Sequence, residues 1–121
     1  MNSFPVESFH TILFCRKWDE CVSFYSDVLG FNKVDTKPGF VELQVSQGSH
    51  IGLLRRDRNN SLTNHGSSFI LSFRVENLEE THIILAEHCP GISAIKEHSW
   101  GDLLFELKDP EGRLLEFWSS R

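Results

Sequence analysis

A repeat that runs along the whole chain constrains the fold more than any other feature. Residues 10–29 align without a gap on residues 70–89, and residues 40–54 align on residues 104–118. Few residues are identical, but the apolar positions and the turn glycines coincide. Because a repeat of this size is one supersecondary unit written twice, we predict a single domain over residues 1–121. It would consist of two similar modules, at residues 6–56 and 68–120, with Arg55–Ser68 as a polar linker.

Each module reads as a strand and a helix followed by three strands. Short apolar runs over residues 9–15 and 69–75 predict the first strand of each module. In the first module the helical spacing of apolar residues stops at Gly30, a residue typical of helix ends. In the second module we expect Asn77 to cap the helix and Gly91 to end it.

Each module then closes with a hairpin. In the second module the turn at Asp109–Gly112 sets Glu106 opposite Glu116, and the same register sets Glu42 opposite Gly52 in the first. A slip by one residue would turn the glutamates of the inner strands toward the helices, where burial of a charge is costly. The strands of these hairpins are expected at residues 40–45, 49–54, 105–108 and 113–118.

Side chains alternate across a strand, so each sheet has an apolar face for the helices and a face of mixed character, called here the mixed face. Three glutamates on the mixed faces, balanced only by Arg74 and Lys108, favour a cationic aromatic ligand. Two alternatives stay open: Trp100 packs in the core, and Glu116 pairs with Arg74, His10 or Lys108. The candidate ligand-binding residues are Glu42, His50, Arg74, Trp100, Glu106 and Trp118.

Several motifs carry a family resemblance. They are His10 opening the first strand, Ser23-Phe24-Tyr25 through Leu29-Gly30-Phe31, Trp100-Gly101, and Asp109-Pro110-Glu111-Gly112 leading to Leu115-Glu116-Phe117. Together they resemble the vicinal oxygen chelate superfamily, which includes glyoxalase I, the extradiol dioxygenases, fosfomycin-resistance enzymes and bleomycin-resistance proteins. The resemblance implies an α+β fold in which two βαβββ modules form curved mixed sheets. It also implies a homodimer, because half-barrels of this kind leave open sheet edges.

The resemblance further implies four metal-ligand positions, which are His10, Gly52, Ile70 and Glu116 in this chain. Only His10 and Glu116 carry a donor atom, whereas divalent transition metals are usually held by three or more protein ligands. We therefore expect no cofactor, with a divalent metal at His10 and Glu116 as the open alternative.

These observations favour a small-molecule-binding protein with a degenerate metal site, similar to bleomycin-resistance proteins. One alternative is a metal-dependent lyase, isomerase or dioxygenase of the glyoxalase type. The other is a structural or regulatory dimer module with a vestigial site.

Charge and composition exclude some partners. The formal net charge of −5 gives no basic face for nucleic acid or an anionic membrane. No apolar run approaches the roughly 20 residues that span a bilayer, and the first residues do not read as a signal peptide. Three cysteines without metal-type spacing indicate reduced thiols and a cytoplasmic protein.

Overall fold

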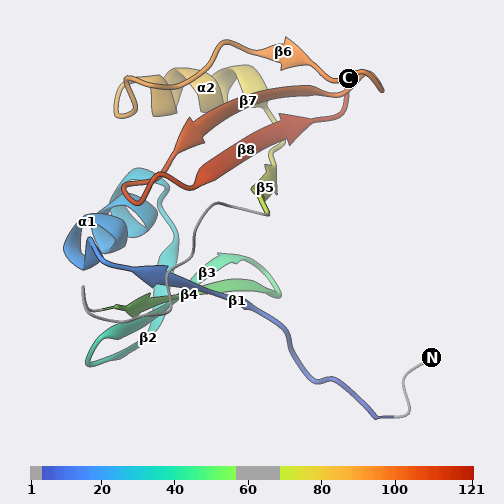
Figure 1. The fold of residues 1–121 in the computed structure, drawn as a ribbon. Coiled ribbons are helices and arrows are strands. Elements are labelled where there is room, and N and C mark those ends of the chain that lie inside the picture. The colour runs from blue at the N-terminus through green and yellow to red at the C-terminus, as the bar shows by residue number, and fades with distance from the viewer. Residues whose placement is uncertain (1–3, 57–68) are drawn as a thin grey trace. The chain divides into compact units, whose positions relative to one another are not determined.

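Both halves of the chain fold into the same succession of elements (Figure 1). The structure is a computed structural model that describes residues 4–56 and 69–121. It divides into two compact units, residues 1–60 and 61–121. Most of the expected linker, residues 57–68, lies outside the described residues. Arg55, its expected first residue, is instead the last residue of a strand. That the two units make one domain stays a prediction.

The first unit is a four-stranded mixed sheet with one helix. Its strand order is β1-β4-β3-β2, with β1 parallel to β4 and the other pairs antiparallel. The helix α1 packs against β4 and continues into a π-helical turn at Phe24–Val28. The elements are β1 (Thr11–Cys15), α1 (Trp18–Ser23), β2 (Asn32–Lys37), β3 (Phe40–Ser46) and β4 (Ser49–Arg55).

The second unit repeats this arrangement. Its strand order is β5-β8-β7-β6, again with the outer parallel pair β5–β8. In Figure 1 the helix α2 lies along β7 and β8, and it contacts both strands. The elements are β5 (Leu71–Arg74), α2 (Leu78–Ala86), β6 (Lys96–Glu97), β7 (Leu103–Lys108) and β8 (Leu114–Ser119). The α+β class and the two mixed sheets predicted from the sequence are confirmed.

The register of both hairpins is the predicted one. Glu42 faces Gly52 across β3 and β4, and Glu106 faces Glu116 across β7 and β8. The first strands are shorter than predicted, since β1 begins at Thr11 and β5 at Leu71. His10 therefore precedes β1 instead of opening it.

One face of each sheet forms an apolar core with its helix. Burial of a large apolar side chain stabilises a fold by about 1.5–3 kcal/mol, so these positions fix which face points away from solvent. All three cysteines are buried free thiols. The fully buried side chains are Leu13, Cys15, Cys21, Tyr25, Leu43, Leu53, Phe105 and Leu115.

The helix ends are partly as predicted. Gly30 follows the first helix with φ of 77°, a left-handed conformation that favours glycine. The Asn77 side chain caps α2 by accepting a hydrogen bond from the Glu80 backbone N–H at 3.0 Å. The prediction that Gly91 ends α2 is wrong, because the helix stops at Ala86. The next residues turn back on Leu85, and Pro90, which has no N–H, cannot continue a helix. Among the described residues no helix is long and apolar enough to cross a membrane.

Candidate functional site

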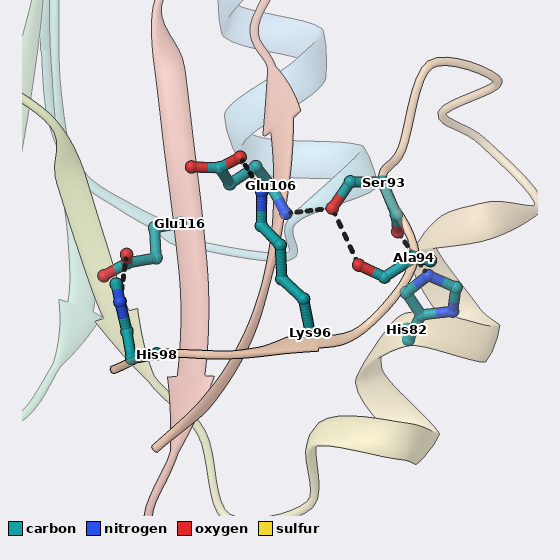
Figure 2. Close-up of polar contacts among 7 residues, drawn as sticks. All are labelled: His82, Ser93, Ala94, Lys96, His98, Glu106 and Glu116. Atoms are coloured by element: carbon teal, nitrogen blue, oxygen red, sulfur yellow. Dashed lines mark hydrogen bonds and ion pairs between the residues drawn. The ribbon is translucent and has the colours of Figure 1, made fainter. Parts of the chain in front are cut away.

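Glu116 accepts hydrogen bonds from two side chains on the mixed face of the second sheet; Figure 2 shows one of them, His98. The Glu116 side chain is 15% exposed. One carboxylate oxygen accepts a hydrogen bond from Ser72 Oγ at 2.7 Å, and the other accepts one from His98 Nε2 at 3.2 Å. Ser72 reaches Glu116 because the two residues are register partners on β5 and β8. Of the alternative partners predicted for Glu116, neither Arg74 nor Lys108 forms an ion pair with it within the described part of this unit.

His98 connects Glu116 to an aromatic side chain. Its ring stacks on the Trp100 indole with centroids 4.0 Å apart and planes 17° apart. The indole Nε1 donates to Asp102 Oδ2 at 3.0 Å, which fixes the ring at a second point. Trp100 is 69% exposed. The alternative that Trp100 packs in the core is therefore wrong. Its indole is an exposed ring that stacks on His98, the residue bonded to Glu116.

Glu106 has a cation of its own. Lys96 Nζ lies 2.9 Å from Glu106 Oε1, as Figure 2 shows. The segment before β6 is tied to β7 because Ser93 Oγ accepts from the Glu106 backbone N–H at 2.9 Å. His82 on α2 donates to the Ser93 carbonyl at 2.8 Å and holds the same segment from the other side. Lys96 thus neutralises a carboxylate for which the sequence predicted no partner of its own.

Arg74 and Trp118 form a second contact on this face. They are register partners on β5 and β8. The Arg74 guanidinium lies 5.2 Å from the centre of the Trp118 ring, a cation–π distance. Its Nη2 donates to Ser120 Oγ at 3.0 Å. Stacking and this hydrogen bond together orient the guanidinium at the end of the sheet.

The first sheet brings together two of the predicted ligand-binding residues. His50 Nδ1 lies 2.7 Å from Glu42 Oε2, and the two side chains are about one-quarter exposed. The neighbouring Gly52 is buried under the Phe40 ring. A Cβ added at Gly52 would lie 2.8 and 2.9 Å from two carbons of that ring.

Only two of the four metal positions that the resemblance implies carry a donor side chain, His10 and Glu116. Gly52 and Ile70 offer no donor, and the space above Gly52 is filled by Phe40. Both carboxylate oxygens of Glu116 already accept hydrogen bonds. No group of three or more His, Cys, Asp or Glu side chains that could hold a metal occurs within residues 4–56 and 69–121. His10 and Glu116 belong to different units, so their sharing an ion stays a prediction.

Sequence reasoning missed His98 and Lys96. Both come from β6, a strand of two residues, and the turn after it. So short a segment gives no periodicity from which a strand can be predicted. Alternation along β5 puts Ser72 on the same face as Arg74, but nothing in the sequence distinguishes it from other serines.

Comparison with known proteins agrees with this architecture. The family model of the Glyoxalase/Bleomycin resistance protein/Dioxygenase superfamily matches residues 8–117. A bleomycin-binding protein solved with bleomycin superposes with a TM-score of 0.72 at 23% identity, covering 96% of this chain and all of that one. A lactoylglutathione lyase from Agrobacterium tumefaciens gives 0.70 at 22% identity, covering 96% of each chain.

A third solved structure, a glyoxalase/bleomycin resistance protein/dioxygenase from Nocardioides, gives a TM-score of 0.77 at 16% identity, covering 99% of this chain and 86% of that one. Identities this low show a common fold and no more. A comparison with curated protein sequences found no significant match. The family model, in contrast, spans nearly all of the sequence. The chain therefore belongs to the Glyoxalase/Bleomycin resistance protein/Dioxygenase superfamily.

Proposed function

We propose that this protein binds a small organic molecule on the mixed face of its second sheet and that its metal site is degenerate. The observation that carries the proposal is the exposed Trp100 indole, stacked on His98, which in turn donates to Glu116. The indole is exposed, and its orientation is fixed by the stack on His98 and the hydrogen bond to Asp102. A planar group of a ligand can stack on such a ring. Because the ring is already ordered, binding costs less side-chain entropy than ordering a free one.

The other candidate ligand-binding residues of the second unit lie on the sheet face to which His98 links Trp100. Glu116 and Trp118 are alternate residues of β8 and share a face, with Arg74 over the Trp118 ring. Glu106 lies opposite Glu116 on the next strand. Arg74, Glu106, Glu116 and the Trp118 indole therefore lie on one sheet face, and Trp100 is linked to it through His98. The Glu42–His50 pair stays a separate candidate polar site on the first sheet.

The degenerate metal site is supported by the first sheet. A donor side chain at position 52 would have to displace the Phe40 ring. Ile70 offers only an aliphatic side chain. With two of the four positions unable to donate, retained His10 and Glu116 would make a weak site at best. The solved bleomycin-binding protein of this fold gives a precedent for ligand binding, though only by analogy of fold.

Two measurements test the proposal. A panel of small aromatic compounds is screened for a rise in melting temperature, since a ligand that binds only the folded state stabilises it. We expect hits that Trp100→Ala abolishes and Ile83→Ala does not; Ile83 is equally exposed but lies on α2. Hits indifferent to Trp100→Ala would place binding elsewhere and contradict the proposal.

Elemental analysis of the purified protein tests the metal site. We expect zinc, nickel, manganese and iron far below one equivalent per chain. One full equivalent that is lost in His10→Ala would show a working metal centre and overturn this part of the proposal.

A further inference from the structure

We infer that the ligand of the second sheet carries a carboxylate and that Arg74 binds it. This inference rests on the proposed function and names the chemical class of its ligand. It reverses the expectation from the sequence, which favoured a cationic ligand. The reversal follows from where the structure places the charges of this one sheet.

The carboxylates of the mixed face are already satisfied. Glu106 pairs with Lys96 at 2.9 Å. Glu116 accepts hydrogen bonds on both oxygens, from Ser72 and His98. A cationic ligand would have to displace these donors or share their acceptors, which reduces its net gain.

Arg74 is in the opposite position. Its guanidinium has five N–H donors, and the one hydrogen bond found for it within the described residues goes to the Ser120 hydroxyl. No carboxylate of residues 4–56 or 69–121 forms an ion pair with it. Arg74 is exposed, so its positive charge, which lacks an acidic partner among the described residues, is also accessible. Lys108 on β7 is exposed as well and forms no ion pair within those residues, but its ammonium lacks the planar fork of a guanidinium.

The cation–π contact with Trp118 makes Arg74 a better receptor than a free surface arginine. The ring 5.2 Å away restrains the guanidinium, while the N–H groups other than the one bonded to Ser120 are available to a ligand. That planar fork matches the two oxygens of a carboxylate and binds it through two parallel hydrogen bonds. Less conformational entropy is lost on binding because the side chain is held beforehand.

The rest of the ligand would extend along the sheet face from Arg74. Arg74 and Ser72 are alternate residues of β5, so their side chains lie about 7 Å apart along the strand. Ser72 bonds Glu116, which is bonded in turn by the imidazole that stacks on Trp100. With its charged end at Arg74, an aryl carboxylate would direct its ring toward Ser72 and this hydrogen-bonded group. A phosphate monoester also suits a guanidinium, but its charge of about −1.5 to −2 at neutral pH would be repelled more strongly by Glu116.

Four probes with one ring system test this. They are 2-naphthoate, 2-naphthyl phosphate, 2-naphthylmethylammonium and 2-naphthalenemethanol, each titrated calorimetrically into the full chain. We expect 2-naphthoate to bind about tenfold or more tighter than each of the other three, a difference of about 1.4 kcal/mol. The affinity for 2-naphthoate should fall as salt rises, because the contact is exposed.

Substitutions of Arg74 test whether its guanidinium binds the carboxylate. Arg74→Lys keeps the charge but loses the fork and the stack, so we expect about tenfold weaker binding of 2-naphthoate, and Arg74→Gln at least as much. Lys33→Gln on β2 is the matched control, since it removes one exposed cation from the other sheet; its affinity should stay within about twofold. Circular dichroism confirms that each variant is folded.

Each outcome has a distinct meaning. A preference for the ammonium probe that is lost in Trp100→Ala leaves the proposed function standing and overturns the carboxylate. A preference for the phosphate overturns the carboxylate but leaves Arg74 as the anion receptor. Equal losses in Arg74→Gln and Lys33→Gln would show general electrostatic attraction and overturn the role of Arg74. If no probe binds at millimolar concentration, both the inference and the proposed function fail.

Discussion

Glu106 and Glu116 face each other directly across β7 and β8, and yet each carboxylate has hydrogen-bond donors of its own. Lys96 approaches Glu106 from β6, whereas Ser72 and His98 bind Glu116. Like charges in opposite positions of a sheet destabilise it. The separate donors allow two acidic residues to occupy neighbouring positions on one face, and they make Lys96 part of the stability of the sheet.

Removing Lys96 should therefore cost about as much as the loss of a strong surface ion pair. We expect Lys96→Met to lower the free energy of unfolding by roughly 0.5–1 kcal/mol, because Glu106 is left facing Glu116 without its cation. In a Glu106→Gln background the same change should have little effect. Urea unfolding of the four proteins measures this coupling, with Lys108→Met as a control from the neighbouring strand. A loss of the same size in both backgrounds would contradict the prediction.

The framework of each sheet could be predicted from the sequence because the repeat and the turns specify it. Offsets of 60 and 64 residues carry the pair Ile12–Gly52 of the first sheet onto Ser72–Glu116 of the second, and the structure has both pairs in register. Alternation then identifies the face on which Arg74 and the glutamates lie. Nothing more than strand period and turn geometry was needed for this part of the site.

The donors on that face could not be predicted in the same way. Lys96 and His98 reach it from a two-residue edge strand and its turn, whose course depends on tertiary bonds such as that of Ser93 to Glu106. With Lys96 and His98 in place, the two glutamates of this face have partners while Arg74 has no acidic one. The charge inferred for the ligand therefore changes from positive to negative. The Phe40 ring above Gly52 is likewise a tertiary contact, which alternation allowed but did not require.

Cys89 should behave as an unreactive thiol and should make stability depend on pH. Burial raises the pKa of the Cys89 thiol in the folded protein. As pH rises, the unfolded chain loses this proton first, so the stabilisation is complete below the ordinary thiol pKa and is lost as pH rises through the raised value. Urea unfolding between pH 7 and 10 should show a decline that is smaller in Cys89→Ala. Identical pH profiles for the two proteins would refute this.

We predict a homodimer in solution. β1 and β5 are edge strands of their sheets, and they carry or adjoin exposed aliphatic residues, with Ile12 45% and Ile70 47% exposed. Open apolar edges of this kind favour association. Sedimentation at micromolar concentration should give about twice 13.9 kDa, and Ile12→Lys should shift the protein toward monomer while Ile83→Lys on α2 does not. A wild-type protein that sediments only as the 13.9 kDa species would rule the dimer out.

Gly52→Ala tests the packing that closes one of the family's metal positions. Alanine is ordinarily favoured over glycine within a strand by roughly 0.5–1 kcal/mol, but here its Cβ would meet the Phe40 ring at 2.8 Å. Such overpacking typically costs 1–3 kcal/mol, so we expect a net loss of about 1 kcal/mol in the free energy of unfolding.

Two comparisons make this prediction specific. Phe40→Leu should remove the penalty of Gly52→Ala, because the ring is what the new methyl group meets. Gly91→Ala should be neutral or slightly stabilising, since no atom lies within 4 Å of its added Cβ. If Gly52→Ala were as stable as the wild type, the Phe40 ring would yield to a side chain. Position 52 would then be open to a donor, and the packing argument for a degenerate metal site would lose its basis.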